Sequence, residues 1–295
     1  MDMTQDELKT LIKPVVDGMG KIPFGVRIPS NWEAPEGFRL EKFTVQDVPV
    51  ERLIPDKNNG KVLFHLHGGA YVMALLDSSR NAAVAYSEMA GGAEVISIDY
   101  RIAPTYHAFA ATDDAVAVYK WLLEQGYEAE NIVFIGDSAG GNLVLSTTLY
   151  LKEHKYPLPK GVIALSPWAC ADETPDSRRR NEDKDLLLGT NGMHLGEYIK
   201  QDSYFNNVDP KNPLASPIYG DYAGFPNLLI QAGTYEMLLD DAVIVAEKAK
   251  EAGVNVWFTA YEGMSHDFQL VFMDIEETKK AWAEMAEFVK SIFSE

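Results

Sequence analysis

Five short apolar runs, separated in most cases by stretches of helical character, limit this chain to few folds. The runs lie at residues 62–64, 95–98, 132–135, 162–165 and 228–230, and a last strand is expected at 254–261. Such runs are typical of strands with both faces covered, and their alternation with helices indicates parallel pairing through right-handed crossovers. We therefore predict an α/β fold with a mostly parallel central sheet and helices on both faces.

Two antiparallel strands are expected between Phe38 and Ile54, which brings the sheet to about eight strands. Thr4 and Glu7 have capping-box spacing, so a helix is predicted over about 5–16, followed by a loop rich in Gly and Pro. Further helices are predicted at 240–252 and near the C-terminus, where apolar residues form a helical stripe of Trp282, Met285, Val289 and Ile292.

One segment, from Ala171 to about Tyr204, does not fit the alternation. It contains Arg178 to Arg180 and then a mixed-charge stretch at 181–185. Charges this dense are typical of a solvated surface, so we interpret the segment as a helical insertion and the arginine run as a surface feature. The whole chain, 1–295, is expected to form a single domain.

Charge and cysteine content exclude several classes of protein. The 26 basic and 44 acidic side chains give a net charge of -18, which disfavours nucleic acid and anionic membranes and favours a small-molecule partner. A single cysteine, Cys170, allows no internal disulfide and no cysteine metal cluster. No apolar run reaches the roughly 18 residues of a membrane span, and the acidic N-terminus does not resemble a signal peptide. A cytoplasmic location is expected.

A Gly-x-Ser-x-Gly pattern, Gly136 to Gly140, joins the run at 132–135 to a helical stretch. A strand-to-helix junction of this kind forces a sharp turn, in which the serine adopts strained angles and presents its hydroxyl to a substrate. A lone match is weak, because small residues at any such turn produce it by chance. The hypothesis that Ser138 is a nucleophile therefore requires a base, an acid and donors for an oxyanion.

Six histidines could supply the base. His266 follows the last predicted strand, in a turn from which a side chain can reach over the carboxyl edge of the sheet. Three others, His107, His154 and His194, lie in surroundings typical of solvated or structural histidines. His65 and His67 alternate along one strand and could form a metal pair, but no third ligand is evident.

His67 also begins the turn His67-Gly68-Gly69-Ala70, which directly follows a strand. Backbone N–H groups at such a turn can donate to the oxygen that becomes negative when an ester is attacked, although a plain Gly-Gly turn has the same spacing. The acid is expected after the strand at 228–231, where Glu236 comes first. Asp240 and Asp241 follow, and we interpret these as compensating the N-terminal charge of a helix.

The chain resembles the hormone-sensitive-lipase-like branch of the α/β-hydrolases, which contains many bacterial carboxylesterases. The resemblance spans roughly Lys61 to the C-terminus. It rests on five motifs in the expected order, namely His67-Gly68-Gly69-Ala70, Asp99-Tyr100-Arg101-Ile102-Ala103-Pro104, Gly136-Asp137-Ser138-Ala139-Gly140-Gly141, Ser166-Pro167-Trp168 and Gly263-Met264-Ser265-His266.

This resemblance implies Ser138 as nucleophile and His266 as base, with an oxyanion hole of N–H groups from Gly68, Gly69 or Ala70, plus Ala139. It also implies a cap made of residues 1–37 and the insertion at 171–204. Two positions depart from the common family pattern. Ala70 replaces a third glycine, and Glu236 replaces the usual aspartate of the triad.

The expected function is hydrolysis of short-chain acyl esters through an acyl-enzyme, without a metal or an organic cofactor. The alternatives are an amidase or formamidase that uses the same triad and a non-catalytic small-molecule receptor on the same fold. A homodimer is plausible by resemblance. Six aromatic residues are candidates for the substrate pocket, with core packing as the alternative interpretation: Phe24, Tyr71, Trp168, Tyr204, Phe205 and Phe268.

Overall fold

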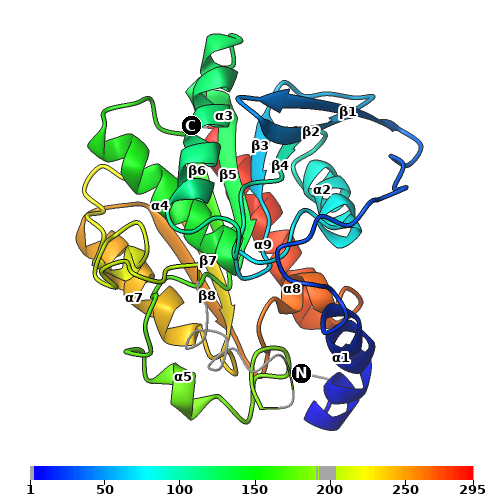
Figure 1. Ribbon diagram of the computed structural model, residues 1–295, viewed down its shortest axis with the longest axis vertical. Helices are drawn as coiled ribbons and strands as arrows, with labels where there is room; N and C mark the ends of the chain where they lie inside the picture. Colours follow the sequence, from blue (N-terminus) through cyan, green and yellow to red (C-terminus); the bar gives the residue numbers. More distant parts are fainter. Residues whose placement is uncertain (1–2, 191, 193–203, 295) are drawn as a thin grey trace.

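The computed structural model describes residues 3–190, 192 and 204–294, and its centre is one sheet of eight strands (Figure 1). Along the chain the strands are β1 (Phe38–Val45), β2 (Val48–Pro55), β3 (Val62–Leu66), β4 (Glu94–Ile98), β5 (Ile132–Asp137), β6 (Gly161–Leu165), β7 (Asn227–Gly233) and β8 (Val256–Tyr261). Their spatial order is β1-β2-β4-β3-β5-β6-β7-β8. The predicted strand count is confirmed.

Strand direction also follows the prediction. β2 is antiparallel to both β1 and β4, whereas every pair from β4 to β8 is parallel. The apolar runs that predicted the parallel strands are buried over the whole length of β3, β4 and β6. As a result, the carboxyl ends of the parallel strands all meet at one edge of the sheet.

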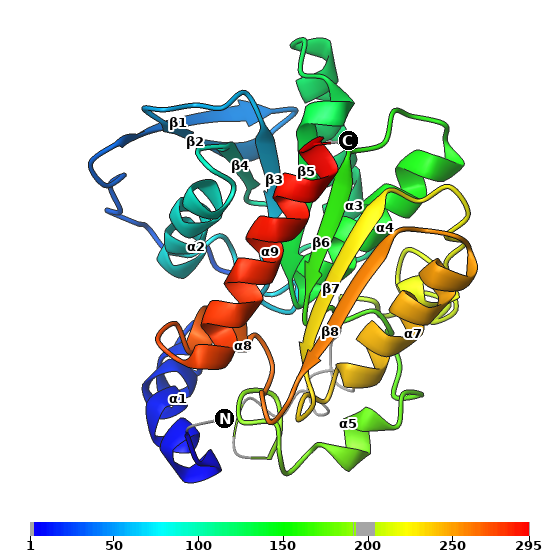
Figure 2. The same ribbon diagram turned by 180° about the vertical axis from the view of Figure 1, so that it is seen from behind.

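Helices cover both faces of this sheet (Figures 1 and 2). They are α1 (Gln5–Met19), α2 (Asp77–Met89), α3 (Ala110–Glu124), α4 (Ala139–Glu153), α5 (Ser177–Arg180), α7 (Leu239–Glu251), α8 (Phe268–Val271) and α9 (Glu276–Ser294). α3, α4 and α7 pack on one face, and α2 and α9 pack on the other. Because successive side chains of a strand point to opposite faces, the strands contribute to two apolar cores, one on each side of the sheet.

The first helix lies at the carboxyl edge, beside α8 (Figure 2). Its predicted capping box is present, because Thr4 accepts from the Glu7 N–H and the Glu7 carboxylate accepts from the Thr4 N–H. Leu8 and Ile12 bury its apolar face, and the Gln5 amide donates to the Gly263 carbonyl at 3.0 Å. The N-terminal segment is thus anchored to the turn that contains His266.

The inserted segment is predicted to be helical. Its described part holds a single turn of helix, α5, followed by irregular turns, whereas residues 191 and 193–203 lie outside the described residues. Within the part of the chain that the structure describes, no helix combines the length and apolarity needed to cross a bilayer.

Candidate active site

Ser138 lies at the turn between β5 and α4, with φ of 53° and ψ of −116°. A positive φ is strained for a residue with a Cβ, and it is maintained here by the surrounding backbone. The Ser138 N–H donates to the Leu165 carbonyl at 2.9 Å, and the Ser138 carbonyl accepts from Trp168 N–H at 3.0 Å. The strand next to β5 therefore fixes this turn through main-chain hydrogen bonds.

The glycines of the motif allow the chain segments around this turn to approach closely. A Cβ on Gly140 would lie 1.9 Å from the Leu66 carbonyl oxygen, and one on Gly136 would lie 2.4 Å from the Gly140 carbonyl oxygen. Only glycine fits at either position without moving backbone. The end of β3, the turn and the start of α4 thus form one compact unit below Ser138.

His266 lies directly over this turn. Its Nε2 is 2.9 Å from the Ser138 Oγ, and its Nδ1 is 3.5 Å from the Glu236 Oε2. His266 and Glu236 are both almost completely buried. The structure thus brings together the serine, histidine and glutamate that the sequence suggested, in the order hydroxyl, imidazole, carboxylate.

Glu236 is fixed by further hydrogen bonds to its other oxygen. Oε1 accepts from the Ser166 hydroxyl and from the Gly233 N–H, each at 2.6 Å. Burial raises the pKa of Glu236 to about 7, against the opposing effects of His266 and Ser166. These contacts leave Oε2 directed at the imidazole.

A second carboxylate reaches the imidazole from the adjacent residue. Asp267 Oδ2 lies 3.1 Å from His266 Nε2, and Asp267 has a left-handed φ of 53°. Burial alone would lower the pKa of His266, but Asp267 and then Glu236 outweigh it and raise this pKa well above its usual value. Burial, together with Asp267, also raises the pKa of the neighbouring Asp137 to about 8.

Sequence reasoning does not identify Ser166 or Asp267 as site residues. Ser166 binds Glu236 through its hydroxyl, and its Oγ also accepts from the Asp267 N–H at 3.2 Å. A usable signal does exist for Ser166, because it directly follows the strand at 162–165 and so lies at the carboxyl edge. Asp267 follows His266 in the chain, but nothing in the pattern predicts which way its side chain points.

The predicted oxyanion turn needs one correction. The Gly68 N–H donates to Asp137 Oδ1 at 3.1 Å, so this amide is already committed to a carboxylate. Gly68 is therefore removed from the candidate donors. Gly69 and Ala70, with φ of 109° and 54°, and Ala139 at the start of α4 stay as candidates.

The two strand histidines contact other protein groups. The His65 Nδ1 lies 2.8 Å from the Ser97 hydroxyl, and burial lowers the pKa of His65 to about 3. The His67 ring stacks on Tyr100 with 4.2 Å between ring centroids. Over residues 3–190, 192 and 204–294, no three or more His, Cys, Asp or Glu side chains are grouped to hold a metal ion.

A small cavity of about 60 Å³ opens beside Ser138 and His266. Its apolar lining comes from the two segments of the predicted cap and from the residues after the oxyanion turn: Met19, Phe24, Val72, Met73, Leu187 and Leu188. Among the aromatic residues predicted to line a pocket, Phe24 does contact this cavity. Asp267 is the charged residue beside His266 in the cavity wall.

The other five aromatic residues are buried core. Tyr71 stacks on Tyr204 with ring centroids 4.3 Å apart, and Trp168 and Phe205 pack edge to face at 5.6 Å. Phe268, fully buried in α8, packs on Tyr261 instead. These five therefore follow the alternative interpretation, core packing: Tyr71, Trp168, Tyr204 and Phe205 pack against one another, and Phe268 packs against Tyr261.

The arginine run is also only partly a surface feature. Arg178 is 4% exposed, and its guanidinium donates to the fully buried Asp241 at 2.8 Å. Arg180 pairs with Asp240 at 2.8 Å, whereas Arg179 points outward as predicted. Asp240 and Asp241 therefore bind arginines of the insertion in addition to lying in the first turn of α7, and Asp240 is not the residue that contacts His266.

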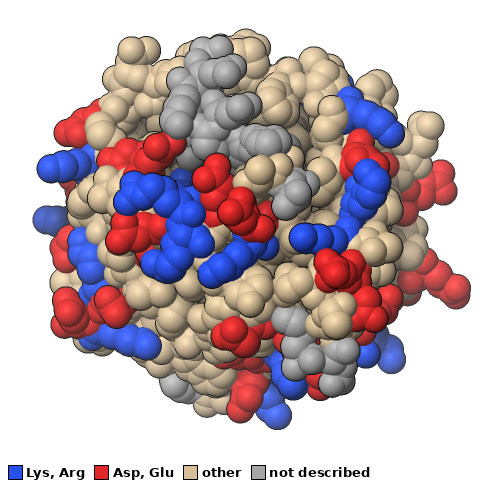
Figure 3. Space-filling model, turned by 90° about the horizontal axis from the view of Figure 1, so that it is seen from below, with Lys and Arg blue, Asp and Glu red and all other residues tan. Residues whose placement is uncertain are grey.

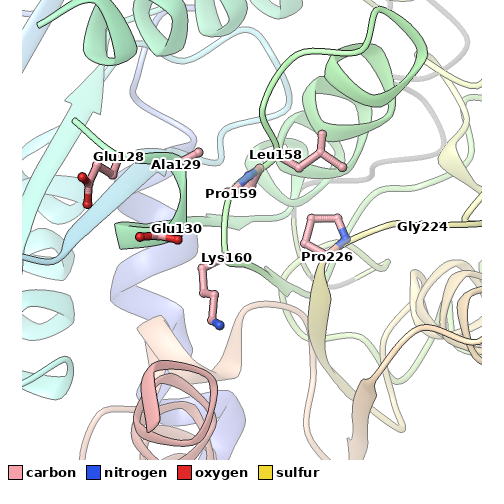
Figure 4. Close-up of a pocket in the computed structure, with 8 residues that line it drawn as sticks. All are labelled: Glu128, Ala129, Glu130, Leu158, Pro159, Lys160, Gly224 and Pro226. Carbon is pink, nitrogen blue, oxygen red and sulfur yellow. The ribbon is translucent and has the colours of Figure 1, made fainter. Parts of the chain in front are cut away.

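The two ends of the parallel strands differ in chemistry. Figure 3 shows the end near the candidate site, where acidic and basic side chains are interspersed. A larger groove of about 520 Å³ lies at the opposite end, among the loops that precede β5, β6 and β7 (Figure 4). Its lining includes Glu128, Glu130 and Lys160 but no serine or histidine. The cavity at Ser138 is smaller, but its wall includes both a serine and a histidine, Ser138 and His266.

The chain is similar in sequence to proteins named as esterases and hydrolases. The chain is 36% identical over 236 residues to an esterase of Acinetobacter venetianus, covering 79% of this chain and 75% of that protein. It is 34% identical over 255 residues to an acetyl-hydrolase of Streptomyces hygroscopicus, covering 85% of this chain and 83% of that one.

The chain is also similar in structure to solved esterases. EstE5, solved in crystals soaked with p-nitrophenyl butyrate, superposes with a TM-score of 0.84 at 30% identity, covering 99% of both chains. An esterase of the bacterial hormone-sensitive lipase family gives 0.80 at 31% identity, covering 99% of this chain and 92% of that one. A family profile described as an alpha/beta hydrolase fold matches residues 63–270. The chain therefore belongs to the α/β-hydrolase family, in its hormone-sensitive-lipase-like branch of esterases.

Proposed function

We propose that this protein is a serine carboxylesterase that hydrolyses short-chain acyl esters through an acyl-enzyme intermediate. The observation that carries the proposal is the 2.9 Å contact between the Ser138 hydroxyl and the His266 Nε2. A serine hydroxyl becomes a competent nucleophile when an adjacent base takes its proton. The strained turn holds that hydroxyl at the sheet edge, where the base can reach it.

In the proposed reaction, Ser138 Oγ attacks the ester carbonyl while His266 Nε2 accepts its proton. Glu236 stabilises the imidazolium that results, and backbone N–H groups of Gly69, Ala70 and Ala139 stabilise the oxyanion. His266 then returns the proton to the departing alcohol. In the second half, a water molecule attacks the acyl-enzyme carbonyl while His266 takes its proton. His266 then returns that proton to Ser138 Oγ as the ester bond to the enzyme breaks, and the carboxylic acid leaves.

The short acyl preference is supported by the size of the cavity and by the relatives. About 60 Å³ beside Ser138 suits a small acyl group in the geometry described. The acetyl-hydrolase of Streptomyces hygroscopicus and the soak of EstE5 with p-nitrophenyl butyrate point to the same class of substrate. Rates over p-nitrophenyl esters from acetyl to palmitoyl should be highest for short chains, and a maximum at long chains would refute this preference.

The principal test is Ser138→Ala. Turnover of p-nitrophenyl acetate should fall by roughly 10⁴-fold or more, because nucleophile and base act as a unit. Ser146→Ala, at a buried serine of α4, the helix that follows Ser138, is the matched control and should retain activity; its hydroxyl donates to the Leu143 carbonyl. Retained turnover in Ser138→Ala would sink the proposal. Labelling of Ser138 by a fluorophosphonate also separates an esterase from a non-catalytic receptor, and p-nitroanilides measure the amidase alternative.

The proposed acid is tested by comparing Glu236→Ala with Asp240→Ala. Glu236 faces the imidazole, whereas Asp240 pairs with Arg180, so the first variant should lose much more of kcat than the second. A larger loss in Asp240→Ala would move the assignment of the acid.

The cap is also part of the proposal. Met19 and Phe24 from the N-terminal segment and Leu187 and Leu188 from the insertion all line the cavity, which supports a cap built from these two segments on a single domain. A homodimer stays a prediction, and light scattering on the purified protein measures it.

A further inference from the structure

Two polar residues of the insertion are buried although the residues between them are exposed. Asn181 is 1% exposed and Asp185 is fully buried, whereas residues 182–184 face solvent. Burying a carboxylate is costly unless several donors satisfy it. These two side chains must therefore have partners elsewhere in the fold, and those partners belong to the candidate active site.

Asp185 joins three segments of the site. Its Oδ1 accepts from the N–H groups of Leu187 at 3.0 Å and Leu188 at 3.1 Å, which hold part of the cavity wall. Its Oδ2 accepts from the Met237 N–H at 2.9 Å, directly after Glu236. The same Oδ1 lies 3.5 Å from the His266 N–H.

Asn181 holds the acid turn from the other side. Its Nδ2 donates to the Thr234 carbonyl at 3.0 Å and to the Glu236 carbonyl at 2.8 Å. Glu236 is therefore held on both sides: Asn181 binds its carbonyl oxygen, and Asp185 binds the backbone N–H of the next residue, Met237. Both side chains come from more than 50 positions earlier in the chain.

We propose that Asn181 and Asp185 are positioning residues for the triad: together they clamp the acid turn, and Asp185 also links that turn to the base and to the cavity wall. This inference rests on the proposed esterase function. Neither side chain touches a reacting atom in the proposed mechanism. Their effect is to keep Glu236 and His266 in register, because a displacement of about 1 Å can cost ~100-fold in rate.

Asp185 should also act through its charge. Four carboxylates interact electrostatically with His266, namely Glu236, Asp267, Asp137 and Asp185, and Asp185 Oδ1 lies 3.5 Å from the His266 backbone nitrogen. An anion near an imidazole favours its protonated form, so removing the Asp185 charge lowers the pKa of His266. The base would then stay neutral, and active, down to a lower pH.

The decisive experiment compares Asp185→Asn with Asp183→Asn, a matched control at an exposed position of the same segment. Asparagine keeps the size of the side chain and an acceptor for the Leu187 and Leu188 amides, but its NH₂ cannot accept from Met237. Rates are taken per active site, counted by fluorophosphonate titration, so that misfolded protein does not contribute.

For Asp185→Asn we expect kcat per site to fall by about tenfold or more and the acidic limb of kcat/KM against pH to move down by on the order of one pH unit. KM should change as well, because the cavity wall loses its anchor. Asp183→Asn should show none of these effects. A residue with a merely structural role would lower the melting temperature and leave all three readouts per site unchanged.

Asn181→Ala is the second variant, which tests the clamp without changing any charge. It should lower kcat per site by several fold while KM and the acidic limb stay in place, since Asn181 touches neither the cavity wall nor His266. Unchanged kcat per site in both Asn181→Ala and Asp185→Asn would overturn the inference. The proposed function would survive that result, because it depends on Ser138→Ala.

Discussion

The serine turn and the acid turn both lie at the carboxyl edge of the sheet, but the protein holds them in different ways. The turn at Ser138 is fixed by main-chain contacts and by glycines that leave no room for a side chain. The turn that carries Glu236 is fixed by polar side chains that reach it from the insertion, at Ser177, Asn181 and Asp185. The acid turn also begins at a crowded glycine, Gly233, where a Cβ would lie 2.0 Å from the Met264 carbonyl oxygen. What distinguishes it from the serine turn is its set of hydrogen bonds to side chains of the insertion.

This difference separates what local sequence can specify from what only the assembled fold can supply. A steric requirement appears in the sequence as glycines at fixed spacing, next to the serine itself. A requirement for distant donors and acceptors leaves no local pattern, because the partners of the acid turn lie more than 50 residues away. Three substitutions test this comparison.

The largest effect is expected for Gly140→Ala, which tests the steric requirement at the serine turn. The new Cβ would lie 1.9 Å from the Leu66 carbonyl and 2.6 Å from the His67 carbonyl, and backbone cannot move away cheaply. The free energy of unfolding should fall by more than about 4 kcal/mol, or no folded protein should form. Urea denaturation measures this loss. Gly18→Ala is the control, since open space surrounds Gly18, and equal losses in both variants would contradict the steric argument.

A smaller loss of stability is expected for Arg178→Met, which removes an ion pair between the insertion and α7. Removing this arginine leaves the buried Asp241 without its partner, which typically costs about 3 kcal/mol or more. Arg179→Met is the matched control, because Arg179 is 71% exposed and pairs with an equally exposed Asp176. Its free energy of unfolding should stay within about 0.5 kcal/mol of the parent. If Arg179→Met were as destabilising as Arg178→Met, burial of the ion pair would not be the cause.

The smallest effect is expected for Asp267→Asn, which changes charge beside the base and little else. Asp267 raises the pKa of His266, so its neutral replacement should lower that pKa. Because the neutral imidazole is the base, the acidic limb of the kcat/KM profile should move to lower pH. A pH series on p-nitrophenyl acetate measures the shift. Asp274→Asn, at an exposed position nearby, should leave the limb in place. A limb that moved to higher pH in Asp267→Asn would show that this carboxylate does not stabilise the imidazolium.

Most of the fold could be predicted because the sheet is buried on both sides. Central strands such as β3 and β6 are buried throughout and are apolar at every position except His65, so the sequence alone identifies them as strands. The stripe on α9 is likewise core, with Met285 and Ile292 fully buried. The insertion could not be predicted in the same way, since its described part has little regular structure and two of its arginines, Arg178 and Arg180, pair with carboxylates about 60 positions later in the chain.

The candidate site divides along the same line. Ser138, His266 and Glu236 follow directly from the ends of predicted strands, and the structure brings them together. The aromatic residues could not be sorted into pocket and core, because that depends on which ring faces which neighbour. The burial of Asp185 could not be predicted for a similar reason, since a carboxylate next to other charged residues in the sequence is typical of a solvated surface.

The bond from Gln5 to the Gly263 carbonyl has a consequence for the order in which the protein is made. Chains emerge from the ribosome N-terminus first, so α1 must wait for a partner that is synthesised 258 residues later. The His266 turn arrives at the same late stage. Ser138 would therefore lack its proposed base until the segment around His266 has been translated, and the Gln5 contact of α1 could form only after Gly263 has emerged.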